Sequence, residues 1–265
     1  MKLKELTDNC VDMYNSRMSF FFKSGPGRGK TTTVLCVPAL ISKALNKNIG
    51  MVIINGGCFT LTDATGYLVP HEVDGVMHSE FTRPFWWRTT EGKFLEEYDG
   101  GIIFIDEEDK MGVDEKKIIG EGKLSGRLAS HTLPPGWVIW SAGNRAEDRS
   151  GSTKTLDHLI NRHIELDVQD DIEGWTEWCT QNSVWAPVVA FGNAHPDIVF
   201  SSKVPDKQGP WCTPRSIVRT GQLLERMVGE AEMNGFSQEL IYGGIGEAAG
   251  RQFITFIKLG YDLPS

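Results

Sequence analysis

Apolar runs alternate with segments of helical periodicity over the first two thirds of the chain. The runs are continuous, as in Met51-Val52-Ile53-Ile54, which is typical of parallel strands that are covered on both faces. Five strands are predicted in this way, at residues 18–23, 50–55, 101–107, 137–144 and 164–168. Helices are predicted beside them at residues 3–15, 32–46, 112–130 and 155–163. This order predicts an α/β fold with a five-stranded parallel sheet between helices.

Strand signals fade after Asp170, and helical signals take over. Trp175, Trp178 and Cys179 recur at the spacing of one helix face, which indicates a core stripe. Further helices are predicted from Pro214 onward and at residues 238–259, with proline at the first turn of the former. We therefore expect two domains, an α/β domain at residues 1–168 and a small helical domain at residues 169–265.

An irregular segment at residues 56–100 interrupts the α/β pattern and contains an aromatic cluster at residues 81–88. One interpretation is an exposed aromatic loop that contacts a partner. The other is an insert whose rings pack on their own domain, which is favoured because large aromatic side chains are mostly buried. The sequence leaves both interpretations open.

The first predicted strand runs into a glycine-rich turn, Ser24-Gly25-Pro26-Gly27-Arg28-Gly29-Lys30-Thr31-Thr32, and the turn opens into a predicted helix. Strand, turn and helix are the context of a phosphate-binding loop. Glycines let backbone N–H groups converge on an anion, and the helix N-terminus favours negative charge. We expect the amides of residues 25–32 and the Lys30 ammonium to bind a polyphosphate, and the Thr31 hydroxyl to bind Mg²⁺. Ser24 stands where the pattern G-x-x-x-x-G-K-[ST] has glycine, and its small size predicts tolerance.

The third predicted strand delivers two carboxylates, Asp106 and Glu107, to its C-terminal end. Ligands bind at that edge of an open α/β sheet. Asp106 is suited to hold Mg²⁺, and Glu107 is suited to deprotonate an attacking water. The acidic run continues in Glu108 and Asp109, which we interpret as charges at the start of the next helix. Lysines and glutamates of that helix are expected on its exposed side.

Polar residues at the ends of later elements extend the candidate site. Asn144 ends the fourth strand, where it could place a water or simply cap a turn. Arg149 and Arg162 follow, and an arginine at a helix end can reach the γ-phosphate held by a neighbouring subunit. A surface salt bridge is the alternative for either arginine. Arg215 sits where the helix at Pro214 begins and could face the nucleotide.

Composition narrows the class of protein. A hydrophobic content of 40% and a charged content of 23% are those of a soluble globular protein, and no apolar run is long enough to cross a membrane. The net charge of −8 argues weakly against broad binding to nucleic acid. Five scattered cysteines form no C-x-x-C pair, and with the absence of a signal peptide they predict a cytoplasmic protein with reduced thiols.

In this order the motifs resemble those of the AAA+ ATPases and, more narrowly, of the MoxR-like group. The narrower resemblance is carried by Thr62-Asp63-Ala64-Thr65-Gly66, Leu133-Pro134-Pro135-Gly136-Trp137-Val138-Ile139, Ala142-Gly143-Asn144-Arg145-Ala146-Glu147-Asp148-Arg149 and Leu159-Ile160-Asn161-Arg162. The resemblance covers most of residues 18–226. It assigns Lys30 and Thr31 to Walker A and Asp106 and Glu107 to Walker B. It further implies that Asn144 is sensor 1, Arg162 the arginine finger, Arg215 sensor 2 and Arg149 a second arginine acting between subunits.

The resemblance also implies an assembly and a function. It implies a ring, usually a hexamer, with ATP and Mg²⁺ between subunits and with inserts around residues 56–100 and 120–135 at the pore or top. It implies ATP hydrolysis that remodels a separate protein partner, often of the von Willebrand A type, with the helical domain acting as a lid. Two alternatives remain open: an AAA+ protein that acts on nucleic acid, and a non-hydrolysing switch in which nucleotide only sets assembly.

Overall fold

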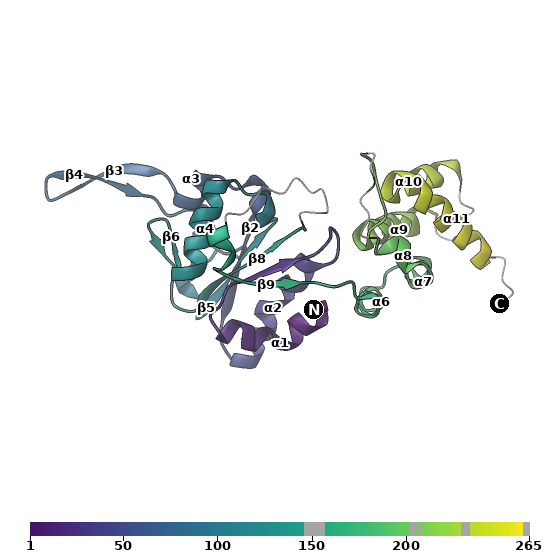
Figure 1. The fold of residues 1–265 in the computed structure, drawn as a ribbon, viewed down its shortest axis with the longest axis horizontal. Coiled ribbons are helices and arrows are strands. Elements are labelled where there is room, and N and C mark those ends of the chain that lie inside the picture. The colour runs from purple at the N-terminus through teal and green to yellow at the C-terminus, as the bar shows by residue number, and fades with distance from the viewer. Residues whose placement is uncertain (146–156, 202–204, 206–207, 229–233, 262–265) are drawn as a thin grey trace. The chain divides into compact units, whose positions relative to one another are not determined.

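A five-stranded parallel sheet with the strand order β2-β5-β8-β1-β9 organises the N-terminal part of the chain (Figure 1). The computed structural model describes residues 1–145, 157–201, 205, 208–228 and 234–261. Contacts divide the chain into two units. The first comprises Met1, Leu3–Ser24 and Lys30–Val168, and the second comprises Lys2, Gly25–Gly29 and Gln169–Ser265.

The strands of the sheet begin and end within two residues of the predicted apolar runs. They are β1 (Phe20–Lys23), β2 (Ile49–Asn55), β5 (Gly100–Asp106), β8 (Trp137–Gly143) and β9 (Ile164–Asp167). The first unit also contains the helices α1 (Leu3–Asn15), α2 (Lys30–Leu45), α3 (Leu61–Thr65), α4 (Val113–Ser125) and α5 (Asp157–Ile160). Two small antiparallel pairs complete it, β3 (Leu68–Val73) with β4 (Val76–Phe81) and β6 (Arg127–Leu128) with β7 (His131–Thr132).

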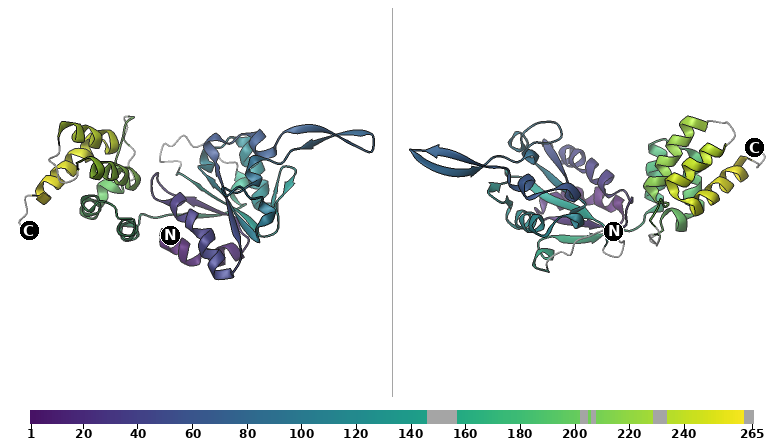
Figure 2. Two further views of the ribbon diagram at one scale, coloured as in Figure 1. Left: turned by 180° about the vertical axis from the view of Figure 1, so that it is seen from behind. Right: turned by 90° about the horizontal axis from the view of Figure 1, so that it is seen from above.

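Both faces of the sheet are covered, as its continuous apolar strands predict. On one face, Ile102 and Phe104 of β5 pack in a core with residues of α1 and α2, which lie side by side in Figures 1 and 2. On the other face, Ile103 and Ile105 pack with Ile119 of α4 and with the insert that follows β2. Successive residues of one strand therefore enter different cores, because side chains alternate along a strand.

The aromatic cluster of the insert is divided between core and surface. Trp86 and Trp87 are buried in a 3₁₀ turn, and their indole N–H groups donate to the Asp63 carbonyl (2.9 Å) and to Glu96 Oε1 (2.8 Å). Phe81 and Phe85 are exposed. The interpretation that the rings pack on their own domain is thus confirmed for the two tryptophans. The two phenylalanine rings are exposed to solvent instead.

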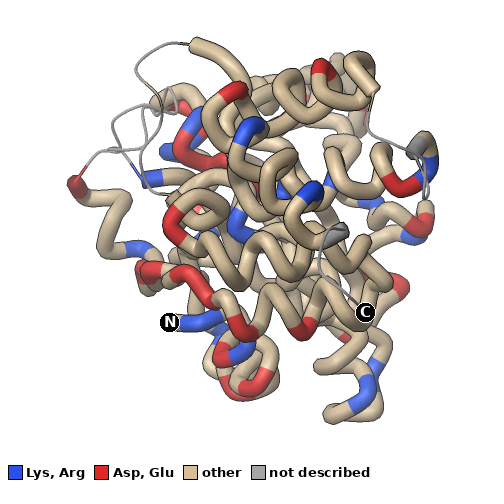
Figure 3. The backbone as a smooth tube through the Cα atoms, turned by 90° about the vertical axis from the view of Figure 1, so that its right-hand side faces the viewer, with Lys and Arg blue, Asp and Glu red and all other residues tan. Residues whose placement is uncertain are grey.

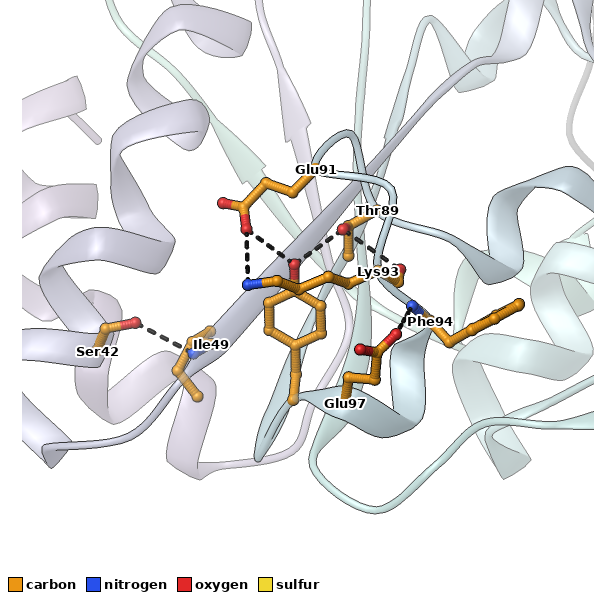
Figure 4. A network of polar contacts seen from close by, with 8 residues as sticks. Ser42, Ile49, Thr89, Glu91, Lys93, Phe94 and Glu97 are labelled. Atoms are coloured by element: carbon orange, nitrogen blue, oxygen red, sulfur yellow. Dashed lines mark hydrogen bonds and ion pairs between the residues drawn. The ribbon is translucent and has the colours of Figure 1, made fainter.

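A β-hairpin and a polar network shape the rest of this insert. Every residue of β3 and β4 is exposed, and their turn, Asp74-Gly75, has positive φ at both positions, as a type I′ turn requires. The hairpin projects from the sheet in Figure 1. Figure 4 shows the polar contacts that tie the segment after the tryptophans, where Thr89 Oγ1 lies 2.9 Å from the Tyr98 hydroxyl and Phe94 N donates to Glu97 (2.6 Å).

Helix α4 ends earlier than the predicted helix at residues 112–130. Gly126 has a left-handed conformation (φ 69°), and its N–H donates to the Gly122 carbonyl, which closes the helix after Ser125. The chain then forms the β6–β7 pair instead of a further helical turn.

The second unit is helical over its described residues beyond Val168. Its helices are α6 (Ile172–Gln181), α7 (Ala186–Ala194), α8 (Pro196–Val199), α9 (Pro214–Val228), α10 (Gly235–Ile245) and α11 (Glu247–Tyr261). They share a core that includes Cys179, Phe191, Ile217 and Phe253. Two predictions need correction here: Trp178 of the expected stripe is exposed, and the single helix predicted at residues 238–259 is two helices.

The break between α10 and α11 falls at Gly246, where φ is 81°. A Cβ there would lie 2.5 Å from the Pro210 carbonyl oxygen, so the position needs glycine for both its conformation and its space. In the part of the chain that the structure describes, none of the helices is long and apolar enough to cross a bilayer.

Candidate functional site

The glycine-rich turn lies between the end of β1 and the start of α2, as the strand–turn–helix pattern predicts. Gly27 (φ 72°) and Gly29 (φ 89°) adopt the left-handed conformation, whereas Gly25 does not. Pro26 and Arg28 complete the turn, and all five residues are half-buried. Two of the three positions therefore need glycine for their backbone conformation. Left-handed residues of this kind allow the N–H groups of a phosphate-binding loop to point inward.

Lys30 and Ser24 contact each other across the turn. Lys30 is the first residue of α2 and is buried, and its ammonium donates to Ser24 Oγ at 2.7 Å and to the Ser24 carbonyl at 3.1 Å. The Ser24 side chain is fully buried. The serine that replaces the expected glycine is thus accommodated, and it gives the lysine an additional oxygen partner.

The two residues expected to bind Mg²⁺ are brought together. Thr31 Oγ1 donates to Asp106 Oδ2 at 2.6 Å, although the strand β8 lies between β1 and β5 in the sheet. A hydroxyl and a carboxylate are the hard oxygen ligands that Mg²⁺ takes, usually in small number and together with waters and substrate phosphates. The pair therefore fits this metal. Thr32, the next residue of α2, is exposed.

Glu107 follows β5 in a left-handed conformation (φ 56°, ψ 38°), which is rare for residues other than glycine, asparagine and aspartate. Its N–H donates to Asp106 Oδ1 (3.0 Å), and its side chain forms an ion pair with Lys110 (3.1 Å). A Cβ at Gly56 would lie 2.6 Å from the Glu107 carbonyl oxygen. Position 56, directly after β2, therefore needs a residue without a side chain, because the Glu107 backbone lies against it. The Gly56-Gly57 pair was a sequence signal for this contact, and sequence reasoning passed over it.

Asn144 directly follows β8, and its backbone N–H donates to Asp109 Oδ1 at 3.1 Å. Asp109 lies in the short 3₁₀ helix at Glu108–Lys110, in agreement with the predicted charges at a helix start, and it is buried. Asn144 and Asp109 join the ends of the neighbouring strands β8 and β5. This contact places the expected sensor next to the expected Walker B segment.

Glu108, the first residue of the same 3₁₀ helix, forms a buried ion pair with Lys123 (2.6 Å), which the sequence did not indicate. Lys123 also donates to Ser141 Oγ (2.9 Å) and lies 3.3 Å from His163 Nδ1. Burial alone would raise the pKa of Glu108, but the charge and hydrogen bond of Lys123 hold that pKa below its usual value. Lys116 of α4 is buried as well, so the predicted exposed lysine face of this helix is wrong at two positions.

The expected arginines fall in different parts of the structure. Arg162 follows α5 and forms an ion pair with Glu121 of α4 (3.1 Å), with its side chain 22% exposed. Arg215 is the second residue of α9 and is exposed. Within the second unit, a Cβ at Gly27 would lie 3.3 Å from Arg215 Cβ, so the turn and the start of α9 are in close contact. Arg149 lies outside the described residues.

Arg28 is held within the second unit. Its guanidinium forms an ion pair with Asp170 (3.1 Å) and donates to the carbonyl oxygens of Phe200 (2.7 Å) and Ser201 (3.0 Å). Sequence reasoning assigned Arg28 only as a backbone donor of the turn. The side chain has this second role because its partners lie more than 140 residues away in the sequence.

Comparison with known proteins supports the fold and leaves the family open. No protein-family model and no curated protein matches the chain. NtrX from Brucella abortus is similar in structure, with a TM-score of 0.50, 16% identity, and coverage of 88% of this chain and 53% of NtrX. The ADP complex of NtrX gives a TM-score of 0.50, 15% identity, and coverage of 89% and 52%. The chain thus spans about half the length of NtrX.

A protein from Cytophaga hutchinsonii, described as a candidate ATPase, is also similar, with 11% identity and coverage of 96% of this chain and 88% of the other. Its TM-score of 0.46 is too low to carry an argument. Together with the strand order of the sheet, the likeness to NtrX confirms the predicted α/β fold, a five-stranded parallel sheet between helices that is followed by a helical C-terminal region.

Proposed function

We propose that this protein is an ATP-hydrolysing AAA+ ATPase of the MoxR-like type, which assembles into a ring and remodels a separate protein partner. Residues 1–168 bind the nucleotide and residues 169–265 form the lid. The observation that carries the proposal is the 2.6 Å hydrogen bond between Thr31 Oγ1 and Asp106 Oδ2, because it joins the Walker A and Walker B segments at one end of the sheet. The ADP complex of the structurally similar NtrX is consistent with this assignment.

Each residue of the site then has a chemical task. Lys30 leaves Ser24 to neutralise the β- and γ-phosphates, and the amides of residues 25–32 bind the phosphate oxygens. Thr31 and Asp106 hold Mg²⁺, which neutralises charge on the phosphates when it is bound. Glu107 accepts a proton from the attacking water, and Asn144 orients that water.

Hydrolysis depends on assembly in this proposal. Arg162 of one subunit stabilises the charge that develops at the nucleotide of its neighbour, a contribution of about 10³ to 10⁵ in rate. Arg215 links the nucleotide to the lid, and Arg149 provides a second contact between subunits. The ring is a hexamer, and a von Willebrand A-type protein is the kind of partner expected for it.

A protein partner is favoured over nucleic acid by the charge of the chain. The net charge is −8, and the acidic and basic positions of the described residues are interspersed in Figure 3. None of the five cysteines forms a disulfide, which agrees with an assignment to the cytoplasm. DNA-stimulated turnover would favour the nucleic-acid alternative, and nucleotide-dependent assembly without phosphate release would favour the switch.

Glu107→Gln tests the assigned base. We expect phosphate release to fall by at least ~10², with ATP binding retained, because the amide cannot accept the proton. Glu80→Gln is the matched control, since Glu80 is exposed on β4. Full turnover in Glu107→Gln would show that another group is the base.

A mixing experiment tests whether Arg162 acts between subunits. Arg162→Ala subunits keep Glu107, and Glu107→Gln subunits keep Arg162, so a mixed ring contains intact sites at half of its mixed interfaces. We expect each variant alone to be inactive and the mixture to regain turnover. If the mixture stays inactive although both variants assemble, Arg162 does not act on a neighbour.

A further inference from the structure

Lys123 near the end of α4 is a charged side chain that is only 1% exposed. Its ammonium has three N–H donors, and three acceptors from three separate elements surround it. These are Glu108 Oε2 at 2.6 Å, Ser141 Oγ at 2.9 Å and His163 Nδ1 at 3.3 Å. Burying a lysine is unfavourable unless it is paired and hydrogen-bonded, and here each donor has an acceptor.

Each acceptor lies beside a residue of the candidate site. Glu108 directly follows Glu107, and His163 directly follows Arg162. Ser141 belongs to β8, the strand that leads into Asn144. One ammonium therefore ties together the segments that carry the expected base, finger and sensor.

Glu107 and Arg162 both lie in turns between elements of regular structure. Glu107 is in a left-handed conformation, which is unfavourable for glutamate and persists only when its surroundings fix it. Arg162 lies between the four-residue helix α5 and β9, where its own N–H donates to the Leu159 carbonyl.

Burial, and then the charge of Lys123, lowers the pKa of His163 to about 4, so its ring is neutral and Nδ1 can accept from the ammonium.

We propose that Lys123 is a positioning residue, whose ammonium holds the Glu107 turn and the Arg162 segment in one fixed geometry for hydrolysis. The inference rests on the proposed function for its catalytic consequence. It goes beyond that function because Lys123 is not among the residues assigned to bind the nucleotide or the metal. A buried ion pair does not by itself add stability over apolar side chains of similar volume, so a role in fixing geometry accounts for its presence.

The test replaces both charges of the pair. Lys123→Met alone would leave the Glu108 carboxylate buried without its ion-pair partner and could prevent folding. The double variant Lys123→Met/Glu108→Gln removes both charges with little change in volume. The matched control is Lys117→Met/Asp114→Asn, which removes the exposed ion pair on the same helix.

Two readouts are used, the first on hydrolysis. In the Lys123/Glu108 double variant we expect kcat to fall roughly tenfold to a hundredfold with KM for ATP changed less than about threefold, because orientation is lost and binding is kept. The control should match the unmodified protein. An unchanged kcat in a folded double variant overturns the proposal, and so does a parallel loss of kcat and binding, which indicates a structural role only.

The second readout is hydrogen exchange without nucleotide. The reporter amides are those of Lys110 and Met111, which donate within the Glu107 turn, and those of Arg162 and Ile164. We expect faster exchange at both sets in the double variant and unchanged exchange in α1. If the unmodified protein hydrolyses no ATP, the proposed function fails, and exchange alone decides whether Lys123 couples the two segments. Unchanged exchange at either set overturns the coupling.

Discussion

Acid should destabilise this protein through His163, and the size of the effect follows from its surroundings. The pKa of His163 lies at about 4, against 6.5 for an ordinary histidine, first because of burial and then because of Lys123. Lys23 acts in the same direction, whereas Glu108 and Glu165 oppose the shift. Between pH 6.5 and pH 4 the unfolded chain therefore binds a proton that the folded chain does not. Stability from this group is present above pH 6.5 and is lost as the pH falls to about 4.

The contribution of His163 to the unfolding free energy has an upper limit, and exposure to solvent reduces it. The pKa difference corresponds to about 3 kcal/mol of unfolding free energy at ~1.4 kcal/mol per pKa unit. His163 is only partly buried, so solvent screening reduces this, and we expect about 1–2 kcal/mol. The variant His163→Gln should lack this component, because an amide oxygen can accept from Lys123 but does not titrate.

The assay is urea unfolding followed by circular dichroism at several values between pH 7 and pH 4. Other groups also titrate in this range, so the quantity of interest is the difference between the unmodified protein and His163→Gln at each pH. His158→Gln is the control, since His158 is exposed on the neighbouring helix α5. If the unmodified protein and His163→Gln lose equal stability on acidification, the lowered pKa of His163 is refuted.

Two further substitutions test local geometry. Gly246→Ala should lose about 1–2 kcal/mol or more in thermal unfolding, because alanine at positive φ is strained and its Cβ would meet the Pro210 carbonyl. Gly243 in α10 has open space around it, so Gly243→Ala should leave the unfolding free energy unchanged or raise it by about 0.5–1 kcal/mol. Equal effects at the two positions would contradict this reasoning. Ser24→Gly should keep the fold and bind a fluorescent ATP analogue a few-fold more tightly, since Lys30 loses a competing hydroxyl partner. Weaker binding would mean that the hydroxyl contributes to the bound state.

The centre of the sheet could be predicted from the sequence because the strands β5 and β8 are buried on both faces. A continuous run such as residues 102–105 fits no exposed element, and the ends of such runs are marked by glycine or charge. The positions of Thr31 and Asp106 followed from the same logic, since Asp106 ends the parallel strand β5 and Thr31 lies in the first turn of the helix that follows β1 and its turn. The pattern of apolar positions was sufficient to predict an element wherever its buried residues recur at regular spacing.

The β3–β4 hairpin and the α10–α11 break could not be predicted in this way. All residues of the hairpin strands are exposed, so no alternation of apolar and polar positions marks them. At the break, apolar positions continue on both sides of Gly246, and only its backbone conformation separates the two helices. The glycine itself was the local signal of a helix end, and an interpretation based on apolar periodicity passed over it.

The buried charges were misread for an energetic reason. A lysine or glutamate in a sequence is assigned to the surface because burying an isolated charge is very costly. Lys123 and Glu108 escape that cost through each other and through Ser141 and His163, and the partners of Lys123 are 15, 18 and 40 residues from it along the chain. The pairing exists only once α4 has packed on the sheet, so no window of sequence contains it.

The ion pair between Arg162 and Glu121 raises the question of whether this arginine is available to a neighbouring subunit. Glu121 is 50% exposed, and a pair of this kind contributes about 0–1 kcal/mol. A rate effect of ~10³ to 10⁵ corresponds to about 4–7 kcal/mol of transition-state stabilisation. Exchange of Glu121 for a developing negative charge is therefore favourable by a wide margin. The proposed roles also agree with the difference in burial: as a finger, Arg162 would have to change partners in each cycle, whereas Lys123, as the residue that positions it, would have to keep its partners.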